Sequence, residues 1–174
     1  MQGTKLSALS RPFDPADLVW KSVATSKDKT AARVVPYVTN RAIMDRLDQV
    51  CGPAGWRNEY SPGPSGGLLC GLSVRVERED GTAEWITKWD GAENTNIQPV
   101  KGGLSASMRR AAVQWGIGRY LYRIPPILAR IDERGRLAER PTLPDAVVSN
   151  GVEPRMPAPA RTVPRPLNGR TVAA

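Results

Sequence analysis

The strongest constraint on the fold is a pair of alternating segments joined by a tight-turn sequence. Residues 68–78 and 83–89 both alternate between apolar and other side chains, and Asp80-Gly81 lies between them. An Asp-Gly pair in this setting is a strong signal for a β-hairpin. The sequence therefore predicts antiparallel strands at the centre of the chain. One face of the first strand carries Cys70, Leu72, Val74 and Val76.

Two helices are predicted, one on each side of this hairpin. The first covers residues 39–52, where Thr39 or Asn40 can cap the start and Gly52 can end the helix. The second begins at about Ser105 and follows a polar connector over residues 90–103. The apolar residues at helical spacing are Ile43, Leu47 and Val50 in the first helix, and Met108, Ala112 and Trp115 in the second.

The remaining segments complete an α+β chain. Residues 14–24 predict a short helix that is capped by Asp14. Residues 32–38 are rich in β-branched side chains and predict a strand, in which Pro36 favours an edge or an end. Residues 127–139 predict one more short strand or hairpin.

Composition predicts one domain with an extension at each end. We expect a flexible arm over 1–12, a domain over 13–140 and a disordered Pro/Ala/Arg-rich tail over 141–174, which holds seven of the 16 prolines. No apolar segment approaches the ~18 residues of a membrane-spanning helix, and the start shows no secretory signal. We therefore expect a cytoplasmic protein with no membrane partner and with both cysteines as free thiols.

The residue types present exclude several classes of chemistry. The chain has no histidine, which excludes a Ser-His-Asp triad and histidine-ligated zinc, and two cysteines are too few for a Cys₄ zinc site. There is no P-loop sequence. Gly116-Ile117-Gly118 is not a dinucleotide-binding motif, because it follows a predicted helix rather than a strand. A net charge of +8 and a pI near 10.0 point to an anionic partner. We expect no enzymatic activity and no cofactor.

The most informative feature for function is a segment without carboxylates. From Asn94 to Ile131 there is no Asp or Glu. Fixed cations without acidic neighbours favour the binding of a phosphate backbone, although an ordinary basic surface, or pairing with acids elsewhere, would also explain them. The basic residues in this segment are Lys101, Arg109, Arg110, Arg119, Arg123 and Arg130.

Two further positions support the same interpretation. Arg41 falls in the first turn of its predicted helix, where the helix dipole disfavours a cation, so either a function or a local pairing explains it. Lys101-Gly102-Gly103 precedes a predicted helix start, whose free amides can hold a phosphate.

Other candidate residues have simpler explanations. Trp85, Trp89 and Trp115 are expected in the core rather than stacked on bases. Asp90 and Glu93 are of a type that can ligate a hard cation, but a polar loop explains them better. Sequence therefore leaves a metal-dependent nuclease as a weaker alternative.

Three segments in this order and spacing resemble the Rad52 family of single-strand-annealing proteins, and most of all its phage and bacterial members. They are YVTNRAIMDRLDQVCGPAGW, GLLCGLSVRVEREDGTAEW and KGGLSASMRRAAVQWGIGRYLY, and the likeness covers about residues 11–125. The resemblance implies a β-meander packed on a long helix and assembly into an oligomeric ring. It also implies a basic groove that holds single-stranded DNA with its bases outward.

Carried over by position, the resemblance assigns Arg41, Arg109 and Arg110 to the DNA groove. Two positions depart from the eukaryotic pattern. Val113 stands where another basic residue is found, and Glu79 replaces a hairpin lysine that is linked to a second, outer DNA site. The outer site is therefore not expected to carry over.

The expected function is ATP-independent binding and annealing of single-stranded DNA in recombination and double-strand-break repair. The expected binding residues are Arg41, Lys101, Arg109, Arg110 and Arg119. Expected partners are single-stranded DNA, further copies of the chain, and a single-strand-binding protein or an exonuclease, with a nucleoid location in a bacterial host. Protection of single strands or DNA ends without annealing is an alternative, and so is a basic face that meets an acidic protein.

Overall fold

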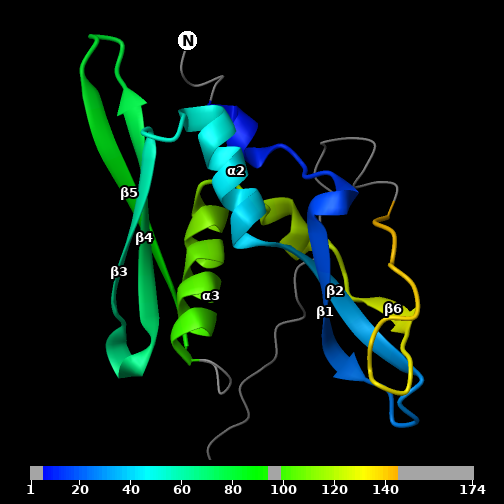
Figure 1. Ribbon diagram of the computed structural model, residues 1–174. Coiled ribbons are helices and arrows are strands. Elements are labelled where there is room, and N and C mark those ends of the chain that lie inside the picture. The colour runs from blue at the N-terminus through cyan, green and yellow to red at the C-terminus, as the bar shows by residue number, and fades with distance from the viewer. Residues whose placement is uncertain (1–5, 94–98, 145–174) are drawn as a thin grey trace, which may run out of the picture.

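The computed structural model describes residues 6–93 and 99–144 (Figure 1). These residues form two antiparallel sheets of three strands each, together with two α-helices and several short 3₁₀ turns. The strands are β1 (Leu18–Thr25), β2 (Ala31–Val38), β3 (Trp56–Pro62), β4 (Leu68–Glu77), β5 (Ala83–Ala92) and β6 (Ile127–Arg130). The helices are α2 (Asn40–Cys51) and α3 (Pro99–Gln114), and the 3₁₀ turns are η1 (Ala8–Ser10), η2 (Pro15–Asp17), η3 (Pro64–Gly66) and η4 (Arg119–Arg123).

The predicted meander is present as the β3–β4–β5 sheet. In this sheet β4 lies between β3 and β5, and Leu72 pairs with Asn58 on one side and Lys88 on the other. One face of the sheet packs on α3, as Figure 1 shows, and buries Cys70 and Val74 completely. The α+β class and the meander packed on a long helix are therefore confirmed.

Helix α2 also follows the prediction. The Thr39 hydroxyl accepts a hydrogen bond from the Ala42 backbone N–H at 3.3 Å, which caps the start of the helix. Gly52 ends it with φ +79°, a conformation that residues with a Cβ rarely adopt. The apolar stripe enters the core, where Ile43 and Leu47 are fully buried.

Helix α3 begins earlier than the sequence predicts, at Pro99 instead of about Ser105. Gly102 and Gly103 therefore lie inside the helix, so the expected phosphate site on free amides after Lys101 is wrong. The Ser107 hydroxyl instead donates to the Gly103 carbonyl at 2.8 Å. Low helix propensity at the two glycines was overridden because the helix packs against β4 and β5.

The segment predicted as a helix over 14–24 is a strand. Asp14 does cap a 3₁₀ turn, by accepting the Ala16 N–H at 2.7 Å, but that turn ends at Asp17 and β1 follows. Leu18 and Val19, which would share a helix face, point to opposite sides of the strand: Leu18 is buried and Val19 is 37% exposed. Antiparallel pairing with β2 along the whole of β1 outweighs the local preference for a helix.

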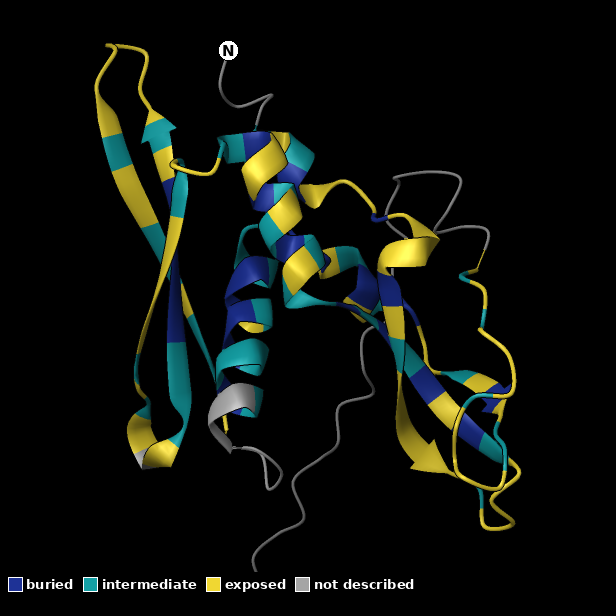
Figure 2. Cartoon of the chain, in the orientation of Figure 1, coloured by how far each residue is buried: buried dark blue, intermediate teal, exposed yellow. Residues whose placement is uncertain are grey.

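The β1–β2–β6 sheet contains the predicted strand at 32–38 as its middle strand. Strand β6 confirms the short strand expected after residue 127, and it pairs only with residues 31–34 of β2. At Pro36, β2 therefore has a neighbouring strand on the β1 side alone, which agrees with a proline near the end of a strand. Figure 2 shows buried residues alternating with intermediate or exposed ones along β2.

The ends of the described chain are packed on the domain. Leu9, within the expected arm over 1–12, is buried in the core, and Arg46 of α2 donates to the Arg11 carbonyl at 2.7 Å. At the other end Arg140 donates to the Leu18 carbonyl at 2.6 Å, and Leu143 packs against the core. Residues 1–5 and 145–174, which hold most of the expected tail, lie outside the described residues, and the bounds 13–140 stay a prediction.

Candidate nucleic-acid interface

The centre of the candidate site is Arg109 on α3. Its guanidinium carbon lies 5.2 Å from the centre of the Tyr37 ring of β2, and one of its nitrogens donates to the Ser105 hydroxyl at 3.2 Å. A guanidinium over an aromatic face is held by the negative charge of the ring. Arg109 is thus half-buried and fixed in place, and no carboxylate pairs with it among the described residues.

A cavity of about 390 Å³ opens beside Arg109, where β2 approaches α3 and η4. Its walls are mostly apolar, and Arg109 supplies the only formal charge among the described residues that line it. The lining residues include Val35 and Tyr37 from β2, Val113 and Ile117 from the α3 side, and Leu121 and Tyr122 from η4. Tyr122 is 66% exposed, which leaves a second aromatic ring at this surface open to solvent.

Arg41 lies at the start of α2, which directly follows β2 and contacts α3. The two supporting backbones meet where the Asn40 side chain donates to the Met108 sulfur at 3.4 Å, and these residues directly precede Arg41 and Arg109. Arg41 is exposed, and among the described residues it forms no hydrogen bond or ion pair. The local pairing that could have explained a cation at the start of a helix is therefore not found there.

Arg110 faces a different side of α3. Its guanidinium forms an ion pair with Asp90 of β5 at 2.9 Å, and the arginine side chain is 52% exposed. Successive residues on an α-helix lie about 100° apart around the axis, so Arg109 turns toward β2 while Arg110 turns toward β5. A half-exposed ion pair of this kind contributes only ~0–1 kcal/mol, so a phosphate can compete with Asp90 for Arg110.

The two remaining predicted binding residues are Lys101 and Arg119, and the structure describes the side chain of Arg119 only. Lys101 lies in the first turn of α3, and its side chain is outside the described part of the structure. Arg119 donates to the carbonyl oxygens of Val113 and Gln114 at 2.8 and 2.7 Å. Both carbonyls belong to the last turn of α3, where the regular helical hydrogen bonds end, so Arg119 has a structural role in capping the helix.

The prediction for the tryptophans holds only for Trp115, whose indole N–H donates to the Leu72 carbonyl at 2.9 Å. Trp85 and Trp89 are 38% and 42% exposed, so their assignment to the core is wrong. They lie on the face of the β3–β4–β5 sheet opposite to α3, where the Trp89 ring lies across Gly71. The alternation of apolar and other residues in the sequence predicts which side chains share a face of the sheet, but not which face α3 covers.

Of the two carboxylates considered for a metal, Asp90 is held by other groups. Asp90 is paired with Arg110 and also accepts the Gly91 N–H at 2.7 Å. Within residues 6–93 and 99–144, no three His, Cys, Asp or Glu side chains gather as a metal site would require. No helix in this part of the chain is long and apolar enough to cross a membrane.

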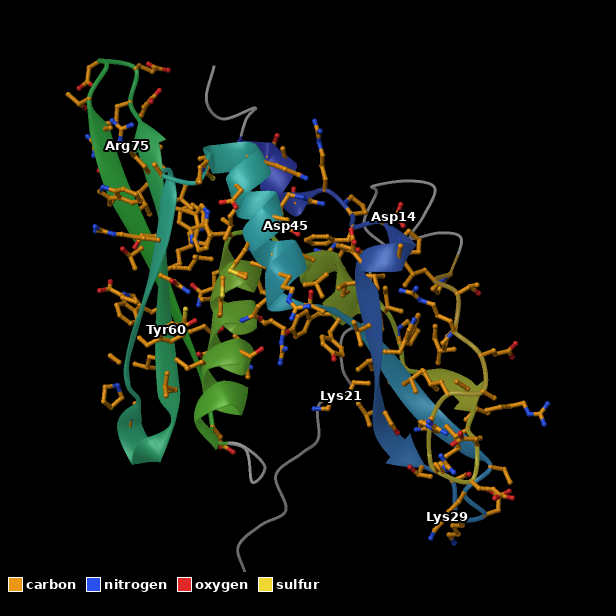
Figure 3. The ribbon with its side chains drawn as sticks, in the orientation of Figure 1. Asp14, Lys21, Lys29, Asp45, Tyr60 and Arg75 are labelled. Carbon is orange, nitrogen blue, oxygen red and sulfur yellow. The ribbon has the colours of Figure 1, made fainter. Side chains whose placement is uncertain are left out.

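Two groups beneath the meander have perturbed acidity. Burial raises the pKa of Cys70 to about 11 and that of Tyr60 to about 12. Tyr60, labelled in Figure 3, lies directly opposite Cys70 in the β3–β4 pairing. Both groups are neutral near pH 7, which suits the sheet face that packs toward α3, and neither adds charge to the candidate site.

The fold and the site together define a small α+β module with a basic surface at the junction of a β-hairpin and a long helix. Residues 2–129 match the model of the Rad52/22 family of double-strand break repair proteins. The chain belongs to this family, as the resemblance of its three segments implied.

Two bacterial relatives are named single-stranded DNA-binding protein DdrA. The one from Deinococcus radiodurans is 34% identical over 140 residues, which cover 79% of this chain and 64% of the relative. The one from Deinococcus deserti is 33% identical over 117 residues, which cover 67% of this chain and 56% of the relative. The chain thus spans between half and two thirds of the length of these relatives.

Proposed function

We propose that this protein binds single-stranded DNA at Arg41 and Arg109 and promotes the annealing of complementary strands. The observation that carries the proposal is that the start of α2 contacts α3 through Asn40 and Met108, the residues that directly precede Arg41 and Arg109, and that neither arginine has a carboxylate partner among the described residues. Family membership and the names of the relatives support DNA as the anion. Arg110 joins the site when a phosphate displaces Asp90, and Lys101 lies about two turns before this pair on α3.

The proposed mechanism is electrostatic. Cations held on rigid helices neutralise phosphates and keep the strand extended, while its bases stay free to test a second strand. Base stacking in the new duplex, ~1.4 kcal/mol per step, supplies the driving force. No covalent bond changes, so the reaction needs neither ATP nor a catalytic side chain.

The proposal includes assembly into a homo-oligomer, in the form of a ring. The outer face of the β3–β4–β5 sheet supports this part, because Trp85 and Trp89 are exposed there and no described element covers them. Exposed aromatic side chains on a sheet face are typical of a surface that another protein covers. The mass of the protein in solution tests it, since a monomeric mass at micromolar concentration would contradict it.

The test of annealing uses two complementary labelled oligonucleotides without ATP or metal. We expect the wild type to accelerate pairing and the Arg41→Gln/Arg109→Gln variant to lose most of that acceleration. The matched control is Arg11→Gln/Arg134→Gln, which removes two exposed arginines away from the site and away from the outer face that carries Trp85 and Trp89. Binding of single strands by the wild type without faster pairing would instead assign the protein to strand protection.

A further inference from the structure

The β1–β2–β6 sheet places its charged residues in an unusual way. Each of its three strands carries one charged residue, and each of them is a cation: Lys21, Arg33 and Arg130. Between β1 and β2, Lys21 lies opposite Val35. Between β2 and β6, Arg33 lies opposite Leu128. Leu128 and Arg130 are two residues apart on β6. Residues directly opposite each other point to the same side of a sheet, and side chains alternate along a strand.

All three cations therefore share one face, and that face also carries Val35 and Tyr37. Val35 and Tyr37 of this face contribute to the lining of the cavity beside Arg109. The opposite face holds Ala32, Val34 and Ala129, which are buried together with Ile131 and Leu137 packed against them. Figure 3 shows Lys21 extending from β1 toward the side of the sheet where α3 lies.

The cationic face is not an ordinary solvated surface. A solvated sheet face mixes charges of both signs with neutral polar residues. On this one the residues between the cations are apolar, and no Asp or Glu stands at any position of the three strands. Among the described residues the side chains of the three cations form no ion pair or hydrogen bond. The exposed apolar residues of these strands are Val19, Val23 and Leu128, at 37%, 54% and 71%.

We infer that this sheet face, through Lys21, Arg33 and Arg130, continues the phosphate-binding path that begins at Arg41 and Arg109. The inference rests on the proposed function and extends the site onto a second element. Charge decides the occupant, because a row of unpaired cations without carboxylates is complementary to a polyanion and repels a second copy of itself.

The dimensions agree with a strand that runs along the sheet. Arg33 precedes Tyr37 by four residues on β2, which at ~3.3 Å per residue separates them by ~13 Å. That distance corresponds to up to about four nucleotides at the ~3.4 Å spacing of a stacked strand. A strand held at Arg109 therefore has the cations of the sheet within reach of its following phosphates.

The experiment compares DNA binding by five forms of the chain over a series of salt concentrations. The test variant is Lys21→Gln/Arg33→Gln/Arg130→Gln, and the charge-matched control replaces three exposed arginines outside this face, Arg11, Arg134 and Arg136, by Gln. The third form is the Arg41→Gln/Arg109→Gln variant, and the fourth is the wild type. The probe is a fluorescent oligodeoxythymidine, and the mass and melting temperature of each form are measured in parallel.

We expect the slope of log K against log salt to be smaller by about 2 in the test variant, because each phosphate that a cation neutralises on a single strand adds about 0.7 to this slope. Near 100 mM salt this corresponds to ~10–100-fold weaker binding. The control should change the slope much less. The fifth form, a conservative variant that exchanges Lys and Arg at the three positions, keeps the charge and should restore binding.

Different failures point to different parts of the proposal. If the test variant binds DNA like the wild type while the Arg41→Gln/Arg109→Gln variant binds more weakly, the role of the sheet face in binding is overturned and the proposed function stands. If the wild type does not bind the oligonucleotide, both are overturned. If the test variant weakens binding only together with a change in oligomer mass, the face is a subunit interface and the inference is wrong.

Discussion

The two sheets of this protein distribute charge in opposite ways. The strands β3, β4 and β5 carry both signs, and several of these charges are neutralised locally: Asp90 pairs with Arg110, Arg75 lies near Glu77, and Lys88 lies 4.3 Å from the Trp115 ring centre. The strands β1, β2 and β6 carry only cations, all on one face. The first sheet holds the core together with α3, and the second leaves its charge available to a partner. Under the proposed function, structural and binding roles are separated between the sheets.

The largest expected effect lies on the covered side of the first sheet. Trp115→Ala should lower the free energy of unfolding by about 3 kcal/mol, because it removes a large packed side chain and a hydrogen bond to Leu72. Trp85→Ala, on the exposed face, should cost below about 1 kcal/mol. Denaturant unfolding measures both. Equal losses of unfolding free energy in the two variants would mean that the two faces of the sheet contribute equally to stability.

The two neighbouring arginines of α3 sharpen the comparison. Arg109→Gln should weaken single-strand binding about fivefold near 100 mM salt and lower the salt slope by ~0.7. Arg110→Gln should have a smaller effect, since a phosphate must first displace Asp90. Replacing both by Ala should lower the slope by about one to two while leaving the protein folded. Fluorescence anisotropy over a salt series measures these slopes, and unchanged affinity in the double variant would remove α3 from the site.

The buried thiol of Cys70 and the partly exposed phenol of Tyr60 predict a loss of stability in alkali. Cys70 and Tyr60 have folded-state pKa values of about 11 and 12, above their usual values near 9 and 10. Both lose a proton more easily when unfolded, so the stability they contribute is complete below about pH 9 and is lost as the pH rises toward about 11–12. Denaturant unfolding at about pH 8–11 should show this decline, and Cys70→Ala should reduce it. The same decline in the variant would contradict the role of Cys70.

The smallest effect is expected from removal of residues 145–174. Arg140 and Leu143 contact the domain, so a deletion that begins after residue 144 preserves those contacts. We expect annealing and melting temperature to change little, since most of the net charge lies in the rest of the chain. The annealing assay on the shortened chain measures this. A collapse of annealing would give the tail a direct part in DNA binding.

Local sequence patterns predicted those parts of the fold that depend on near neighbours. The Asp80-Gly81 hairpin and helix α2 follow from spacing that repeats within a few residues. The prediction was wrong over 14–24, because the pairing of β1 with β2 is a contact that a local pattern does not contain. It was wrong for the start of α3 for a similar reason, since packing on β4 and β5 outweighs two glycines.

The site divides in the same manner. Sequence alone selected Arg109 and Arg110 through the absence of carboxylates and Arg41 through its place at the start of a helix. Family resemblance pointed to all three, and their role in binding stays a prediction. Only the tertiary structure separated Arg109, over Tyr37, from Arg110, paired with Asp90, and placed Arg119 on the carbonyls at the end of α3. It also brought Lys21, Arg33 and Arg130 onto one face. Composition and periodicity are properties of the chain itself, whereas the surroundings of a charge depend on distant segments that meet only in the folded protein.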